Sequence, residues 1–248
     1  MEGKKLNWII KLENLAKDFI FHHQQGMRIK VFEDFSMEFF PGEAAIFSGA
    51  SGAGKSTLLR MIYATYKVGA GKILIKHNNH EVDIARADPA TIYKVRKKTI
   101  GYVSQFLRVV PRISALDTVI EPLIERKIDK TLAMIKGKEI LERLNIHESL
   151  WNLCATTFSG GEQQRINIAR SFIAPYPIML LDEPTASLDP ENRSTVIELI
   201  REAVSCGSCV LGVFHSKKDQ DSVNGRIIDI FPNNKGVQSP IAKGDKII

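Results

Sequence analysis

The segment from Gly49 to Ser56 has the residue types and spacing of a phosphate-binding loop. It reads GASGAGKS and matches the pattern G-x-x-x-x-G-K-[ST]. Glycines let backbone N–H groups close around a polyphosphate, and a helix beginning there adds partial positive charge. The Lys55 ammonium can reach the β- and γ-phosphates of a nucleotide, and the Ser56 hydroxyl can bind Mg²⁺. The nucleotide-binding residues expected here are Gly49, Ala50, Ser51, Gly52, Ala53, Gly54, Lys55, Ser56 and Thr57.

An acidic pair follows a second apolar run, IMLLDEP (178–184). Four apolar residues predict a buried strand, with Asp182 at its carboxyl end, where open α/β sheets bind ligands. We expect Asp182 to hold Mg²⁺ through water and Glu183 to orient and polarise the attacking water. The alternative is a solvent-facing acidic pair at a strand end, which the phosphate-binding loop makes the weaker interpretation.

A third motif, Ser159-Gly160-Gly161-Glu162, lies between these two parts of one site. Ser159 and Glu162 form a capping box for a helix over 162–174, and that structural interpretation is sound by itself. It does not explain two glycines within the box, which weaken a helix and leave backbone N–H groups bare. A bare helix N-terminus binds anions. The phosphate bound here cannot easily be the one that Lys55 of the same chain holds, unless a second copy supplies this face. We therefore expect Ser159, Gly160 and Gly161 to bind a nucleotide held by a second copy.

The elements that must position these motifs alternate between strand and helix. A capping box at Ser114–Asp117 opens another helix, in which Pro122 predicts a kink. The other expected helices are 55–66, 131–145, 162–174 and 190–204. The expected strands are 6–12, 27–35, 36–40, 43–49, 72–76, 178–182, 210–214 and 226–231. This order predicts an α/β fold with a mostly parallel sheet and a helical insertion.

Length and composition limit the remaining function classes. The 248 residues are 44% hydrophobic and 25% charged, which excludes collagen-like, coiled-coil and disordered chains. No apolar run is long enough for a transmembrane helix, and Lys11 and Glu13 interrupt the N-terminal apolar stretch, so we expect no secretory signal. Three cysteines form no disulfide framework, which favours a cytoplasmic location.

The net charge of +6 does not by itself predict nucleic-acid binding. The densest basic cluster, within 94–98, has no aromatic ladder beside it. A solvated helix face, or a patch for an acidic partner, explains it better, and we expect no direct nucleic-acid contact.

The order of the motifs resembles that of ATP-binding-cassette (ABC) ATPases over roughly residues 6–232. To the three motifs above the sequence adds Gln105 after a strand, Ser187-Leu188-Asp189, and His215 after a strand. The resemblance implies a P-loop NTPase of the ABC type with an N-terminal antiparallel β subdomain, in one domain over 1–248. The helical subdomain would span about 106–170, and a loosely held tail about 232–248.

The same resemblance implies the cofactors, ATP and Mg²⁺, and a second cassette as partner, identical or paralogous. ATP would lie between one phosphate-binding loop and the opposite Ser159–Gly161 segment, with Asp189 also at the nucleotide. Gln105 would join Ser56 and Asp182 as a metal ligand, and Lys55, Glu183 and His215 would be catalytic. Phe19 matches an aromatic residue that stacks on adenine. Taken alone, Phe19 fits a core residue better, and a lone His215 is more often structural.

Longer segments are similar to the ATP-binding subunit of the bacterial carbon–phosphorus lyase system (PhnL type). They are SQFLRVVPRISALDTV (104–119), ATTFSGGEQQRINIARSFI (155–173), KHNNHEVDI and PTASLDPENR. This implies an ATPase in alkylphosphonate breakdown, associated with soluble lyase core subunits and with the synthesis of ribose 1-methylphosphonate 5-triphosphate.

Two other functions stay open. The stretch QFLRVVPRISALDTVIEPL also resembles cassettes of the lipoprotein-release and macrolide-export kind, which would make the chain a transporter motor. The second open function is that of a nucleotide-gated scaffold that barely hydrolyses ATP. The sequence departs from the common cassette pattern at Phe158, Glu162 and Ser216, but these changes remove no expected catalytic group.

Overall fold

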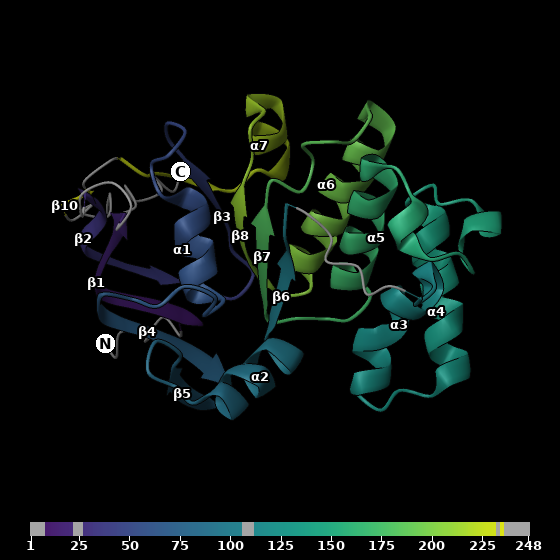
Figure 1. Ribbon diagram of the computed structural model, residues 1–248, viewed down its shortest axis with the longest axis horizontal. Coiled ribbons are helices and arrows are strands. Elements are labelled where there is room, and N and C mark those ends of the chain that lie inside the picture. The colour runs from purple at the N-terminus through teal and green to yellow at the C-terminus, as the bar shows by residue number, and fades with distance from the viewer. Residues whose placement is uncertain (1–7, 22–26, 106–111, 232–233, 236–248) are drawn as a thin grey trace, which may run out of the picture.

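The computed structural model describes residues 8–21, 27–105, 112–231 and 234–235. Two five-stranded sheets organise this part of the chain (Figure 1). The expected tail over 232–248 lies outside the described residues except for 234–235, and the helical segment expected from about 106 is described from 112 onward.

The first sheet is antiparallel apart from one edge pairing, and its strand order is β10-β2-β1-β4-β5. Its strands are β1 (Ile10–Phe21), β2 (Met27–Phe39), β4 (Ala70–His77), β5 (His80–Asp83) and β10 (Asn234–Lys235). The two strands expected at 27–35 and 36–40 are wrong as separate elements, because β2 is continuous. A register shift opposite Leu15 and a left-handed Asp34 (φ 59°) absorb the irregularity as a bulge. Strand β5 was not expected from the sequence. It pairs with β4 through a tight turn in which Asn78 and Asn79 have positive φ.

The second sheet is parallel throughout, in the order β6-β7-β8-β3-β9. Its strands are β3 (Ala44–Ser48), β6 (Ile100–Val103), β7 (Ile178–Asp182), β8 (Cys209–Val213) and β9 (Arg226–Asp229). In β7 and β8 every residue is buried, as expected for a sheet covered on both faces. The phosphate-binding loop follows β3 and the acidic pair ends β7, so both lie at the carboxyl edge of this sheet.

Helices connect the strands and cover the parallel sheet. They are α1 (Lys55–Ile62), α2 (Pro89–Lys98), α3 (Ala115–Glu125), α4 (Lys130–Arg143), α5 (Gly160–Phe172), α6 (Pro190–Ser205) and α7 (Lys217–Val223), with 3₁₀ turns at Glu148–Leu150 and Ala155–Thr157. The helix expected over 55–66 ends earlier, at Ile62. Ala64 is left-handed (φ 58°), and the N–H groups of Thr65 and Tyr66 both donate to the Arg60 carbonyl, which closes the helix. Helix α3 continues through Pro122 to Glu125.

Two apolar cores hold these layers together. Helix α1 lies between the two sheets, while α5 and α6 cover the other face of the parallel sheet, with α3 and α4 beyond them (Figure 1). Alternate residues of β7 point into opposite cores: Leu180 packs toward α1, and Leu181 packs toward α5 and α6. In the described part of the chain, no helix combines the length and apolar character needed to cross a membrane.

Candidate active site

The loop between β3 and α1 leaves the helix N-terminus open to an anion. Gly54 begins α1 in a left-handed conformation (φ 101°), and no side chain caps the helix. The first backbone N–H groups of α1 are therefore available, and the helix dipole favours negative charge there. Lys55 Nζ donates to the carbonyl oxygens of Gly49 (2.7 Å) and Ala50 (2.8 Å), which keeps the ammonium inside the loop.

A cavity of about 340 Å³ opens over this loop. Nine of the residues expected at the site line it: Gly49, Ser51, Gly52, Gly54, Lys55, Ser56, Thr57, Glu183 and His215. Five lining residues were not expected from the sequence: Phe47, Ser48, Val213, Phe214 and Gln220. Gln220 Nε2 donates to the Phe214 carbonyl (2.9 Å), which fixes the segment that carries His215. Ala53 is buried beneath the loop and does not line the cavity.

Gly49 is a position at which the loop tolerates no side chain. Its φ is +136°, and an added Cβ would overlap the carbonyl oxygen of Ile230. We predict that Gly49→Ala lowers the free energy of unfolding by about 1–3 kcal/mol and removes nucleotide binding. Denaturant unfolding and a nucleotide titration measure both. Gly160→Ala is the stability control, since a Cβ there meets nothing within 4 Å. Equal unfolding midpoints for wild type and Gly49→Ala would contradict the prediction.

Asp182 and Ser56 form the oxygen-rich part of the site. The Ser56 hydroxyl donates to Asp182 Oδ1 (2.6 Å), although the two residues come from α1 and β7. Asp182 is 1% exposed, and Gln105, which follows β6, donates to the adjacent Glu183 at 3.2 Å. Hydroxyl, carboxylate and carboxamide oxygens suit Mg²⁺, which uses few protein ligands beside phosphate oxygens and water. These three residues therefore fit the expected metal.

Glu183 lies between two polar side chains at the cavity. His215 Nε2 is 2.9 Å from Glu183 Oε1, and Gln105 Nε2 donates to Glu183 Oε2 at 3.2 Å. The Glu183 side chain is only 16% exposed, and its backbone is left-handed (φ 56°). Such a conformation costs a non-glycine residue about 1–3 kcal/mol, and it occurs often at functional sites. Oriented by two neighbours, the carboxylate can accept a proton from water.

The Ser159–Gly161 segment and Asp189 do not line this cavity. Ser159 caps α5 and forms the full capping box with Glu162, as the structural interpretation requires. A Cβ on Gly161 would lie 3.3 Å from the Ser187 carbonyl, so this helix start adjoins the Ser187–Asp189 loop. Asp189 caps α6 through the Asn192 N–H (2.9 Å), which lowers the pKa of its carboxyl group. Ser159, Gly160 and Asp189 are exposed, and none of them lines the cavity over the loop of this chain.

Phe19 packs against the protein rather than facing the cavity. Its ring meets Tyr66 edge-on with centroids 5.7 Å apart, and Lys17 Nζ lies 4.8 Å from the ring centroid. It is half-buried and is not a lining residue, so its expected contact with adenine stays a prediction.

Sequence reasoning missed a tyrosine and an arginine beside Asp182. The Tyr102 hydroxyl donates to Asp182 Oδ2 (3.2 Å), and Arg60 Nη2 is 3.7 Å from the same oxygen. Burial, and secondarily the Asp182 charge, raises the pKa of the Tyr102 phenol. The one sequence signal was a hydroxyl-bearing residue within the short strand IGYV, whose partner the sequence did not identify.

A buried carboxylate behind His215 was missed as well. Asp219 is 3% exposed and accepts from the Thr185 hydroxyl at 2.8 Å. This contact joins helix α7, which follows His215, to the loop that follows Glu183. It therefore helps to fix the distance between the two catalytic candidates.

Comparisons with known proteins identify the family of this chain. A family model described as ABC transporter matches residues 32–186. The lipoprotein-releasing system ATP-binding protein LolD of Shewanella oneidensis is 32% identical over 211 residues, which cover 85% of this chain and 88% of that protein. The arginine transport ATP-binding protein ArtP of Haemophilus influenzae is 32% identical over 196 residues, which cover 79% of this chain and 80% of that protein.

The fold has a solved counterpart. A dimeric structure of a post-hydrolysis state of the ATP-binding cassette MJ0796, bound to ADP and Pi, has a TM-score of 0.80 and 28% identity, covering 93% of this chain and 97% of that one. The antiparallel β subdomain, parallel sheet and helices expected from the sequence are confirmed as the ABC ATPase fold. The chain therefore belongs to the ABC transporter family, as an ABC-type ATPase nucleotide-binding subunit.

Proposed function

We propose that this chain, acting as one cassette domain, hydrolyses Mg²⁺-bound ATP together with a second cassette and thereby drives a membrane permease of the lipoprotein-release or macrolide-export kind. The observation that carries the catalytic part is the position of Glu183, which contacts both His215 and Gln105 at the rim of the loop cavity.

Some of the site residues bind the nucleotide, and others take part in its hydrolysis. Backbone N–H groups of the loop and the start of α1 bind phosphate oxygens, while the Lys55 ammonium lies near the β- and γ-phosphates. Ser56, Gln105 and Asp182 would hold Mg²⁺, which would supply positive charge to neutralise the charge that develops on the phosphate oxygens. Glu183 accepts a proton from the attacking water. The water oxygen forms the new bond to the γ-phosphorus while the bond to ADP breaks. His215 holds Glu183 in place and faces the γ-phosphate.

We expect a second cassette to complete the site, because the Ser159–Gly161 helix start does not line the cavity over its own loop. It presents backbone N–H groups next to Asp189 on a face outside the cavity. The dimeric cassette MJ0796 supports this arrangement by its similarity to this chain. The second cassette is either an identical chain or a paralogue.

The permease is the partner that the relatives favour. LolD proteins from Shewanella oneidensis and Myxococcus xanthus are 32% and 31% identical to this chain, and both are named as parts of a lipoprotein-releasing system. The chain would then be a peripheral motor that binds a permease helix.

The carbon–phosphorus lyase system is the second candidate, favoured by one observation. Two segments resemble its ATP-binding subunit, 104–119 and 155–173. Their described residues include the start of α3 and the whole of α5, and these two helices pack on each other. A shared partner surface there would explain why both segments resemble that subunit. Soluble lyase core proteins would replace the permease, and phosphonate chemistry would occur on them.

Affinity purification of the tagged full-length chain from its native cells separates the candidates. We predict that it sediments with membranes and captures a multi-span protein, and that adding this protein raises phosphate release. The same purification is then repeated from cells grown with a phosphonate as the sole phosphorus source. Capture of soluble lyase subunits there, without membrane association, would replace the permease by the second candidate. Phosphate release that stays near background with every captured partner would instead indicate a nucleotide-gated scaffold.

A further inference from the structure

The two oxygens of the Asp182 carboxylate have different partners. Oδ1 accepts from the Ser56 hydroxyl at 2.6 Å, and Oδ2 accepts from the Tyr102 hydroxyl at 3.2 Å. Arg60 Nη2 lies 3.7 Å from Oδ2, which is too long for a hydrogen bond. A buried carboxylate needs partners for both oxygens, and Tyr102 is the neutral donor that supplies the second one.

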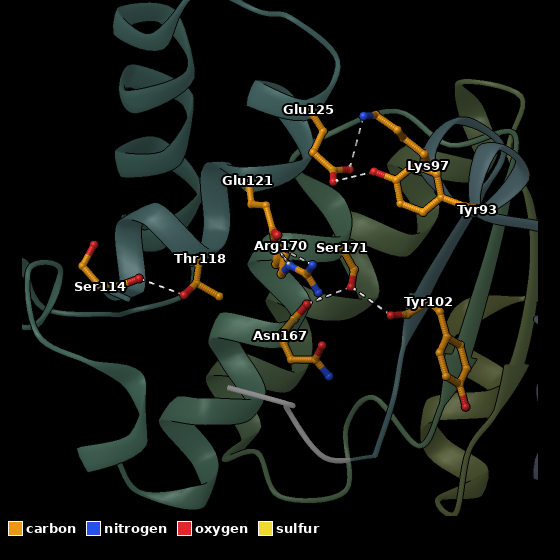
Figure 2. Close-up of polar contacts among 10 residues, drawn as sticks. All are labelled: Tyr93, Lys97, Tyr102, Ser114, Thr118, Glu121, Glu125, Asn167, Arg170 and Ser171. Carbon is orange, nitrogen blue, oxygen red and sulfur yellow. Dashed lines mark hydrogen bonds and ion pairs between the residues drawn. The ribbon is translucent and has the colours of Figure 1, made fainter. Parts of the chain in front are cut away.

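The Tyr102 side chain is itself held in place. Strand β6 pairs with β7 so that Tyr102 lies opposite Leu180, two residues before Asp182. The Tyr102 ring stacks on Tyr63 with centroids 4.7 Å apart, and the Arg96 guanidinium lies 4.4 Å from the Tyr63 ring centroid. From α5, the Ser171 hydroxyl donates to the Tyr102 carbonyl (3.2 Å; Figure 2). Reorienting the phenol would therefore break a ring stack.

The same tyrosine pair forms a wall of a second cavity, of about 350 Å³. Residues of α2, α3, α5 and β6 line this cavity. Among them are Glu121 and Arg170, which contact each other at 2.6 Å (Figure 2). In Figure 2 the Tyr102 ring points away from this ion pair, and its hydroxyl donates to Asp182, the last residue of β7. Tyr102 thus borders this cavity on one side and contacts Asp182 with its hydroxyl on the other.

We propose that Tyr102 is a positioning residue for the metal site: its hydroxyl holds Asp182 Oδ2, so that Oδ1 stays directed at Ser56 and would be available to Mg²⁺. The inference rests on the proposed binding of Mg²⁺-ATP. Removing a hydrogen-bond partner of a metal-ligating group typically lowers metal affinity 10- to 100-fold. We expect the lower end, about tenfold, because Arg60 stays near the same oxygen.

The test measures Mg²⁺ dependence rather than turnover. The full-length chain and its Tyr102→Phe variant, which keeps the ring stack, are titrated with a non-hydrolysable ATP analogue at increasing Mg²⁺, and again in EDTA. We expect Tyr102→Phe to need about tenfold more Mg²⁺ for half-maximal tightening of binding. Its nucleotide affinity in EDTA should match that of wild type, while the lost hydrogen bond to the buried Asp182 should lower its melting temperature.

Tyr93→Phe is the matched control, because the Tyr93 hydroxyl lines the same cavity and donates only to Glu125 among the described contacts. Its Mg²⁺ dependence should equal that of wild type. The positioning role would be overturned if Tyr102→Phe needed the same Mg²⁺ concentration as wild type, or if both variants needed an equally raised concentration. Either result would leave the proposed function standing. A wild-type chain whose nucleotide binding ignores Mg²⁺ would overturn the proposed function and this inference together.

Discussion

Glu183→Gln binds Mg²⁺-ATP with near wild-type affinity but hydrolyses it at least about 100-fold more slowly, because the variant has lost its general base. The amide has the size of the carboxylate and keeps an oxygen that can accept from His215 Nε2. It cannot take the proton of the attacking water. Its NH₂ group would also face the amide of Gln105, so one of the two contacts that orient residue 183 becomes unfavourable.

ATP without hydrolysis should hold two cassettes closed on each other. Phosphate release at saturating Mg²⁺-ATP measures the loss of turnover, and light scattering or crosslinking measures the accumulated dimer. Glu198→Gln is the matched control, since this α6 carboxylate is 59% exposed and contacts only Arg143 among the described ion pairs. Wild-type turnover by Glu183→Gln would remove Glu183 from its catalytic role.

The parts of the site that the sequence predicts are those made by neighbours along the chain. Gly49 to Ser56 are consecutive, so strand, glycines and helix start identify the loop without any tertiary information. Asp182 and Glu183 end a run of buried residues in the same way. The fold class follows from the alternation of elements, which solved relatives confirm.

The parts that the sequence does not predict depend on contacts between distant segments. The bond of Tyr102 to Asp182 requires the register of β6 against β7, and that of Thr185 to Asp219 requires helix α7 to pack beneath the loop after Glu183. Local exceptions are equally hidden: the bulge at Asp34 and the left-handed Ala64 override the patterns that predicted a strand break and a longer helix. The identity of the partner depends on surfaces, and short motifs describe surfaces poorly.

Two variants that are each inactive alone, Lys55→Ala and Gly160→Glu, should hydrolyse ATP when they are mixed, if each cassette completes the site of the other. Lys55→Ala removes the ammonium of the loop. Gly160→Glu places a negative charge on the opposite face, where the partner's nucleotide phosphate would lie. The second change should not harm folding, since a Cβ at Gly160 meets nothing within 4 Å and an acidic residue in the first turn suits the helix dipole.

An equimolar mixture, equilibrated in ATP, should therefore recover up to about a quarter of the wild-type rate, because half of the randomly formed two-fold dimers carry one intact site of two. The matched mixture combines Lys55→Ala with Glu183→Gln. Both of these residues serve the loop of their own chain, so each mixed dimer has two defective sites and stays inactive. Recovery in both mixtures would show that the loop and Glu183 act in different sites. If the mixture of Lys55→Ala with Gly160→Glu hydrolyses no ATP, although crosslinking shows mixed dimers, the Ser159–Gly161 segment does not complete the partner's nucleotide site.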